Sequence, residues 1–179
     1  MEMAAPIQRG MEPDHLAFDA FLPNEAATSA LAACLWPLCN TGDVIALWGD
    51  LGAGKTSFAR GFVRTATHPE EEVPSPTFTL LQTYETTGIT IYHFDLYRIE
   101  SPDEVIELGV EDAFSDGISL IEWPGRMGYW LPPNRLDVTL TSSGKENQES
   151  GRSVTLSAPS ATWGNRLQHL DLRAFHDHC

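Results

Sequence analysis

Apolar positions along this chain fall into short runs that alternate with amphipathic stretches. Strand-like segments are expected at residues 16–22, 44–48, 77–84, 89–94, 118–121, 136–141 and 152–158. The run at 44–48 is apolar throughout, which favours a strand buried on both faces of a sheet. The short connection at 86–88 favours an antiparallel hairpin, and residues 136–158 are expected to form a final strand pair.

Helical patterns begin near residues 24, 56, 101 and 160. Pro37 is expected to end or distort the first helix. Ser101 and Glu104 have the spacing of a capping box at the start of the third helix, with Pro102 at its first position. Because helices and strands are interleaved, the pattern predicts an α/β domain in three layers.

The length of the chain is that of one domain, which we expect to span residues 15–179. Residues 1–14 are predicted to be a disordered extension. The polar connection at 142–151 is predicted to be a mobile loop, and residues 160–179 a C-terminal helix and tail.

Composition narrows the possible partners and locations. Eleven Lys and Arg against 25 Asp and Glu give a formal net charge of −14, so we expect poor independent binding to nucleic acid. The odd number of cysteines (Cys34, Cys39, Cys179) argues against a disulfide framework, and Cys34 and Cys39 are expected to pack in or near the core. No membrane span or secretory signal is evident, so a cytoplasmic protein is expected.

A glycine-rich segment separates the strand at 44–48 from the helix that follows. It fits the pattern G-x-x-x-x-G-K-[ST] over Gly49, Asp50, Leu51, Gly52, Ala53, Gly54, Lys55 and Thr56, and Ser57 comes next. The glycines let backbone N–H groups turn toward an anion, and the helix adds the positive end of its dipole. Lys55 is expected to reach the phosphates of ATP, and the Thr56 hydroxyl to ligate Mg²⁺. This motif predicts a P-loop NTPase fold with a mixed, largely parallel central sheet that includes antiparallel strands.

Two carboxylates end neighbouring apolar strands, Asp95 after residues 89–94 and Glu122 after residues 118–121. A P-loop enzyme needs an acid at such a strand end to position magnesium, directly or through water. One of the two is expected to serve the metal and the other the attacking water. Thr77 is expected to face the γ-phosphate, with Thr79 as the second choice.

The segments GDLGAGKTSFARGF, SPTFTL, YHFDLYR and IEWP occur in this order along the chain. With them, residues 22–158 resemble the bacterial TsaE (YjeE) family, small P-loop ATPases required for making threonylcarbamoyladenosine on tRNA. The resemblance implies ATP hydrolysis that is slow in the isolated chain and supports the TsaD and TsaB proteins. It also implies that tRNA is contacted only through those partners.

The resemblance further implies roles for single residues. Lys55 and Thr56 would be the P-loop lysine and the magnesium ligand, and Glu122 the second acid of the metal site. Asp95 would be a catalytic or switch carboxylate, and Thr77 would lie in the first switch. Additional residues on the nucleotide side would be Trp123, Asn24 or Glu25, and Arg152.

Three other functions stay open. A small-molecule kinase would usually carry an arginine-rich lid, whereas Arg60, Arg64, Arg98 and Arg126 are scattered. A GTPase would usually carry an Asn-Lys-x-Asp segment, which the sequence lacks. A nucleotide-gated binding module would hold ATP without turnover and would tolerate the loss of Asp95.

Overall fold

The computed structural model describes residues 14–142, 151–168 and 170. The predicted disorder before Asp14, the predicted mobility between Ser142 and Gly151, and the tail beyond Leu170 therefore lie outside the described residues.

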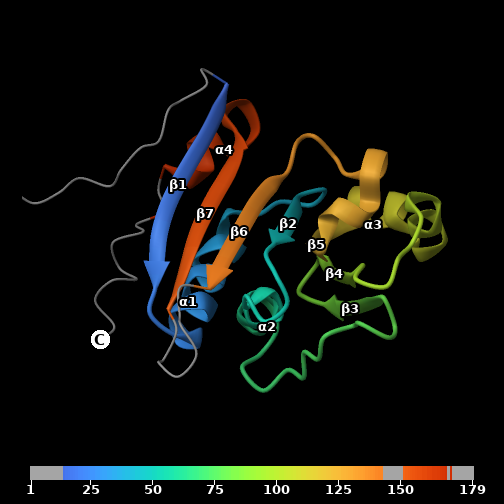
Figure 1. Cartoon of the computed structure of the whole chain (residues 1–179), viewed down its shortest axis with the longest axis horizontal. Coiled ribbons are helices and arrows are strands. Elements are labelled where there is room, and N and C mark those ends of the chain that lie inside the picture. Colours follow the sequence, from blue (N-terminus) through green and yellow to red (C-terminus); the bar gives the residue numbers. More distant parts are fainter. Residues whose placement is uncertain (1–13, 143–150, 169, 171–179) are drawn as a thin grey trace, which may run out of the picture.

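Strands of the described chain form one seven-stranded sheet in the order β1-β7-β6-β2-β5-β4-β3 (Figure 1). The strands are β1 (His15–Leu22), β2 (Val44–Trp48), β3 (Leu81–Glu85), β4 (Thr90–Asp95), β5 (Gly117–Glu122), β6 (Leu136–Ser142) and β7 (Arg152–Pro159). Strands β6, β2, β5 and β4 run parallel at the centre, while β1 on β7, β7 on β6 and β3 on β4 are antiparallel pairs. The first and last strands therefore lie side by side (Figure 1). The predicted mixed sheet is confirmed.

Helices cover both faces of this sheet. They are α1 (Glu25–Leu35), η1 (Trp36–Leu38), α2 (Lys55–Ala66), η2 (Pro102–Leu108), α3 (Val110–Asp116), η3 (Pro124–Trp130) and α4 (Ser160–Leu167). One core cluster joins buried side chains of α1, α2 and α4 to the sheet, among them Leu31, Phe58 and Trp163. A second cluster joins η2, α3 and η3 to the strands, and its buried side chains include Val105 and Met127. These two clusters give the predicted three layers.

Helix ends follow the local chemistry of the sequence. The Asn24 side chain caps α1 by accepting a hydrogen bond from the Ala27 N–H at 2.9 Å. Helix α1 ends at Leu35, and Pro37 lies in the 3₁₀ turn that follows. The capping box of Ser101 and Glu104 is present at the start of η2, which is a 3₁₀ helix.

Two expectations were wrong. Strand β3 begins at Leu81 and not at residue 77, because a turn closes first: the Leu80 N–H donates to the Pro76 carbonyl at 2.6 Å. Cys34 is exposed, because the buried residues of α1 are Ala27, Thr28, Leu31, Ala32 and Leu35. Cys39, by contrast, is partly buried against the core, as expected.

Within the described residues, no helix has both the length and the apolar character needed to cross a membrane.

Candidate functional site

The glycine-rich loop connects the carboxyl end of β2 to the first turn of α2. Gly54, at φ +105°, directly precedes α2, and a Cβ there would lie 2.6 Å from Nε of Arg152. At Gly49, at φ +137°, a Cβ would lie 2.3 Å from the Leu140 carbonyl oxygen. The positive φ therefore favours glycine at both positions, and at Gly49 the backbone carbonyl of Leu140 leaves no room for a side chain.

Lys55 lies under this loop and is only 4% exposed. Its ammonium group donates hydrogen bonds to the carbonyl oxygens of Gly49 and Asp50, each at 2.7 Å. The same group lies 4.1 Å from the centre of the Trp123 ring, a cation–π contact. Burial lowers the pKa of Lys55, and the nearby carboxylates, Glu122 foremost, act in the opposite direction. A cation is thus held at the opening of the loop.

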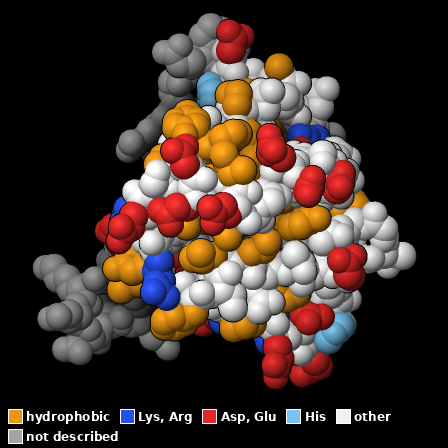
Figure 2. Space-filling model, turned by 90° about the vertical axis from the view of Figure 1, so that its right-hand side faces the viewer, with side chains coloured by type: hydrophobic (Ala, Val, Ile, Leu, Met, Phe, Trp, Pro, Cys, Tyr) orange, Lys and Arg blue, Asp and Glu red, His pale blue; other side chains and the backbone are white. Residues whose placement is uncertain are grey.

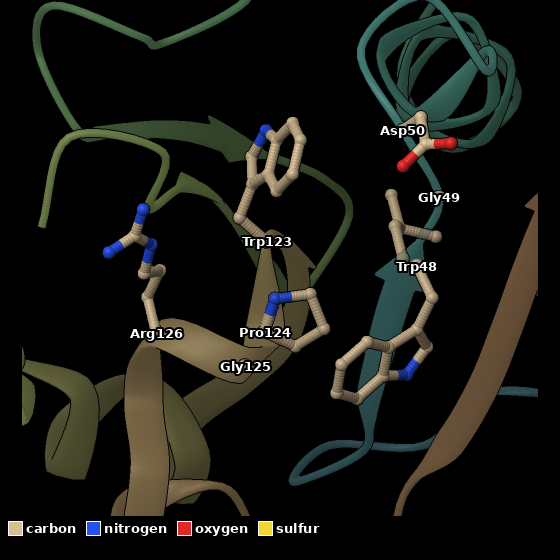
Figure 3. Close-up of a pocket in the computed structure, with 8 residues that line it drawn as sticks. Trp48, Gly49, Asp50, Trp123, Pro124, Gly125 and Arg126 are labelled. Atoms are coloured by element: carbon tan, nitrogen blue, oxygen red, sulfur yellow. The ribbon is translucent and has the colours of Figure 1, made fainter.

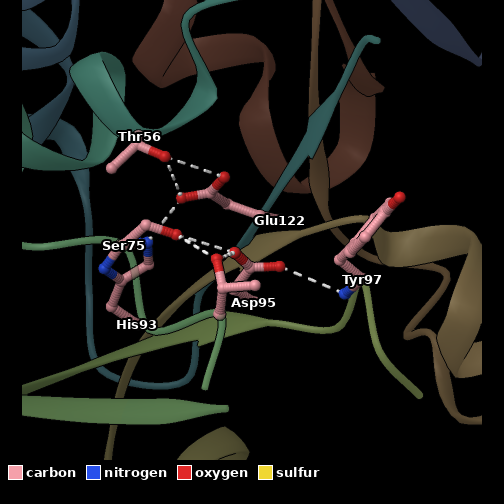
Figure 4. Close-up of polar contacts among 7 residues, drawn as sticks. Thr56, Ser75, His93, Asp95, Tyr97 and Glu122 are labelled. Carbon is pink, nitrogen blue, oxygen red and sulfur yellow. Dashed lines mark hydrogen bonds and ion pairs between the residues drawn. The ribbon is translucent and has the colours of Figure 1, made fainter. Parts of the chain in front are cut away.

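Thr56, at the start of α2, reaches the acid that ends β5. Its hydroxyl is 2.9 Å from Oε1 and 3.1 Å from Oε2 of Glu122, so it donates to both oxygens of one carboxylate (Figure 4). On its other side, Oε1 of Glu122 lies 2.9 Å from Nε2 of His93, a buried residue of β4.

Asp95 ends β4 beside Glu122, because the two residues are register partners in adjacent parallel strands. Its Oδ2 accepts hydrogen bonds from the hydroxyls of Ser75, at 2.8 Å, and Thr77, at 2.7 Å. Its Oδ1 accepts the backbone N–H of Tyr97 at 3.1 Å (Figure 4). The segment before β3 is thereby attached to the acid that ends β4.

Trp123 follows Glu122 in a left-handed backbone conformation, with φ 59° and ψ 48°. Such a conformation is uncommon for a residue with a side chain and often occurs at functional sites. It places the indole between Lys55 and Tyr97, whose ring centre is 5.1 Å from that of Trp123.

These side chains surround a cavity of about 280 Å³. It is lined by Leu51, Gly52, Gly54, Lys55, Thr56, Ser57, Ser75, Thr77, Asp95, Tyr97, Glu122, Trp123 and Arg152. The structure thus brings together both predicted carboxylates, Thr77, Trp123, Arg152 and most of the predicted loop.

Other predicted residues lie elsewhere. The Asn24 side chain caps α1, and Glu25 forms an ion pair with Arg60 at 3.1 Å, so neither lines the cavity. Ala53 is buried within the loop. Gly49 and Asp50 line an adjoining cavity of about 430 Å³, with Trp123 as a shared wall.

The adjoining cavity lies between the ends of β2 and β5. Figure 3 shows Trp123, Pro124, Gly125 and Arg126 on one side of it, and the segment from Trp48 to Asp50 on the other.

Oxygen ligands suitable for a hard divalent cation converge at the first cavity. No group of three or more His, Cys, Asp or Glu side chains in the described residues could hold a metal ion by itself. Thr56 and Glu122 together provide a hydroxyl and a carboxylate, with the Asp95 carboxylate close by. Mg²⁺ is commonly held by one or two such protein oxygens together with phosphate oxygens and water. The residues present therefore fit a magnesium ion that accompanies a phosphate ligand.

Sequence reasoning missed three residues of this network: Ser75, His93 and Tyr97. Each lies two residues from a predicted site residue, Thr77 in one case and Asp95 in the other two. For His93, the alternation of side chains along the predicted strand at 89–94 could have drawn attention to it, since His93 and Asp95 point to the same side.

The P-loop class of proteins is defined by a parallel strand, a glycine-rich loop and a helix. Acids at the ends of the neighbouring strands in the sheet, here β5 and β4, complete this arrangement. Comparison with known proteins identifies the family within that class. The family model described as "Threonylcarbamoyl adenosine biosynthesis protein TsaE" matches residues 22–153. The chain therefore belongs to the TsaE family, and this membership indicates a role in tRNA threonylcarbamoyladenosine biosynthesis.

Individual relatives agree with the family model. A TsaE protein of Rickettsia felis is 44% identical over 119 residues, which cover 66% of this chain and 70% of the relative. TsaE of Bacillus subtilis is 36% identical over 148 residues, 82% of this chain and 87% of the relative. The crystal structure of B. subtilis YdiB superposes with a TM-score of 0.72 at 27% identity, covering 91% of this chain and 98% of that one.

Proposed function

We propose that this chain binds ATP with Mg²⁺ and hydrolyses it in support of threonylcarbamoyl transfer to adenosine in tRNA, acting with TsaD and TsaB. The observation that carries this proposal is the convergence of Lys55, Thr56, Asp95 and Glu122 on one cavity at the glycine-rich loop. Family membership supports the pathway.

Phosphate binding is assigned to the loop and the first turn of α2. Backbone N–H groups at a glycine-rich turn and at a helix start are donors for an anion, and the helix dipole favours negative charge there. Lys55 adds a cation that is already held in place by two carbonyl groups. This side chain therefore loses little conformational freedom when it meets a phosphate.

The two carboxylates are assigned different roles because their partners differ. Glu122 bonds to Thr56, the expected magnesium ligand, so we place Glu122 on the metal side. Asp95 bonds to Ser75 and Thr77 and has no such contact with Thr56 among the described residues, so we assign it to the attacking water. When bound, Mg²⁺ would neutralise charge on the phosphate oxygens.

Surface charge supports an indirect role toward tRNA. Figure 2 shows the face that carries α3, where acidic side chains outnumber basic ones. Exposed acids on η2 and α3 are Asp103, Glu104, Glu107, Glu111, Asp112 and Asp116, and the sequence has no Lys or Arg between Arg98 and Arg126. Because binding to nucleic acid relies on cations at the phosphates, we assign tRNA contact to the partner proteins. The cytoplasm is the location proposed for this function.

Calorimetric titration with ATP and with GTP, each with and without Mg²⁺, tests nucleotide binding directly. We expect tighter binding of ATP, a gain in affinity with Mg²⁺, and loss of binding in Lys55→Ala. Thr56→Ala should lose the gain from Mg²⁺ and retain metal-free binding. No binding of ATP by the wild-type chain, or equal binding by Lys55→Ala, would overturn the assignment.

Reconstitution tests the pathway. Modification of tRNA by TsaD and TsaB, supplied with the threonylcarbamoyl donor, should require this chain and ATP, and Lys55→Ala should not replace it. Full modification without the chain would contradict the proposed role.

A further inference from the structure

His93 is a buried polar residue in the middle of the sheet, close to the candidate site. It belongs to β4, and its side chain has no exposed surface. Along β4 it alternates with Asp95, so both side chains point to the sheet face that α2 covers. Leu120 of β5, its register partner, and Ile91 on the same face are both apolar core residues.

The direction of its hydrogen bond follows from the chemistry of the partner. Nε2 of His93 lies 2.9 Å from Oε1 of Glu122, and an ionised carboxylate can only accept. Nε2 must therefore carry the hydrogen. The other ring nitrogen, Nδ1, is buried and has no hydrogen-bond partner in the described part of the chain. An apolar side chain would fill this position without an unpartnered buried nitrogen, so packing alone does not explain the histidine.

Two contacts together fix the orientation of the Glu122 carboxylate. The Thr56 hydroxyl is nearly equidistant from both oxygens, at 2.9 and 3.1 Å, and so does not select one of them. His93 contacts Oε1 alone. Its bond therefore sets the rotation of the carboxylate and keeps both oxygens toward Thr56 (Figure 4).

We propose that His93 is a positioning residue that holds the Glu122 carboxylate in the orientation required for a magnesium ion beside Thr56. The inference rests on the proposed function, since it assigns a role within the same metal site. Hydrogen-bond partners of ligating carboxylates orient them, and losing such a partner typically costs about 10–100-fold in metal affinity or activity.

The test compares three substitutions of His93 with a control in the same sheet. In His93→Gln the amide nitrogen can occupy the place of Nε2 and donate to Glu122. In His93→Asn the amide is too short to reach, and His93→Leu has no donor. Ser119→Ala is the control, because Ser119 is a buried residue of β5 whose hydroxyl has no partner in the described residues and does not contact Glu122.

The affinity of each variant for ADP is measured at increasing concentrations of Mg²⁺, and the quantity compared is the Mg²⁺ concentration that gives half of the increase in affinity. The ADP affinity without metal and the melting temperature are measured alongside. We expect His93→Asn and His93→Leu to raise that concentration by about 10–100-fold, and His93→Gln and Ser119→Ala to stay within about threefold of wild type. Metal-free ADP affinity should not change in any variant. Unchanged Mg²⁺ dependence in a folded His93→Asn or His93→Leu would overturn only the role of His93 and leave the proposed metal site standing. If Mg²⁺ had no effect on the wild type, both the role of His93 and the proposed metal site would be overturned.

Nitrogen-15 NMR of His93 in the unliganded wild-type chain gives a second readout that needs neither metal nor substitution. We expect hydrogen on Nε2, the nitrogen that faces Oε1 of Glu122. Hydrogen on Nδ1 alone would mean that Nε2 accepts, and it would overturn the inference even if the Asn and Leu variants do not fold.

Discussion

Replacing Glu122 by Gln tests the acid at the end of β5 with little change in shape. The native carboxylate is 3% exposed and is hydrogen-bonded by Thr56 and His93. A hydrogen bond to a charged group contributes about 1.5–3 kcal/mol, and a neutral one about 0.5–1.5 kcal/mol. Two weakened bonds therefore cost about 2 kcal/mol.

An opposing effect limits this loss of stability. A buried carboxylate carries a desolvation cost of several kcal/mol, which the neutral amide avoids in part. We therefore expect the free energy of unfolding to fall by less than about 2 kcal/mol, or less than about 8 °C in melting temperature for a domain of this size. Glu122→Gln should remain folded, so that a change in activity can be assigned to the site.

The functional effect of Glu122→Gln should be much larger. Without the carboxylate, ATP should still bind through Lys55 and the loop, but the gain from Mg²⁺ should be lost. A loss of about 3 kcal/mol of transition-state stabilisation corresponds to about 10²-fold in turnover. Phosphate release under saturating ATP measures it, with Glu107→Gln, an exposed acid-to-amide change on η2, as the matched control. Turnover within twofold of wild type would refute the assignment of Glu122.

Three further outcomes are expected. Gly54→Ala should weaken ATP binding, because φ +105° is strained for alanine and the new Cβ would displace the Arg152 side chain that lines the cavity, whereas Gly52→Ala, whose Cβ meets no described atom within 4 Å, should weaken it less; calorimetry with ATP compares them. Because burial lowers the pKa of Lys55, the ammonium should lose its proton, and phosphate affinity should begin to fall, before a rising pH reaches 10.5. Lys55→Arg should keep its affinity over the same rise in pH, and equal pH profiles of the two proteins would contradict this. Cys34, which is exposed, should react with iodoacetamide before Cys39, whose pKa is raised mainly by burial; peptide mass mapping over time measures the order, and faster labelling of Cys39 would contradict the placement of α1.

Local signals in the sequence were sufficient for the elements that hold the phosphate loop. A fully apolar strand, glycines at strained positions and a helix start specify the loop almost without tertiary information. The capping box at Ser101 is likewise local, since both of its partners lie within three residues.

Features that depend on tertiary contacts were not predictable in this way. The turn from Pro76 to Leu80 delays the start of β3, and the segment that contains it is attached through Ser75 and Thr77 to Asp95, about 20 residues further along the chain. The pairing of His93 with Glu122 depends on β4 and β5 being neighbours, and the sequence does not state the strand order. Cys34 fits an apolar helical pattern, but its exposure is set by which side of α1 meets the sheet.

The most direct test of the account is ATP turnover by the purified chain, first alone and then with TsaD and TsaB, in wild type and in Lys55→Ala. We expect turnover that rises when the partners are added and disappears in the mutant, because Lys55 is the cation held at the phosphate loop. Tight binding of ATP without turnover in any mixture would contradict the ATPase proposal and favour a nucleotide-gated binding module.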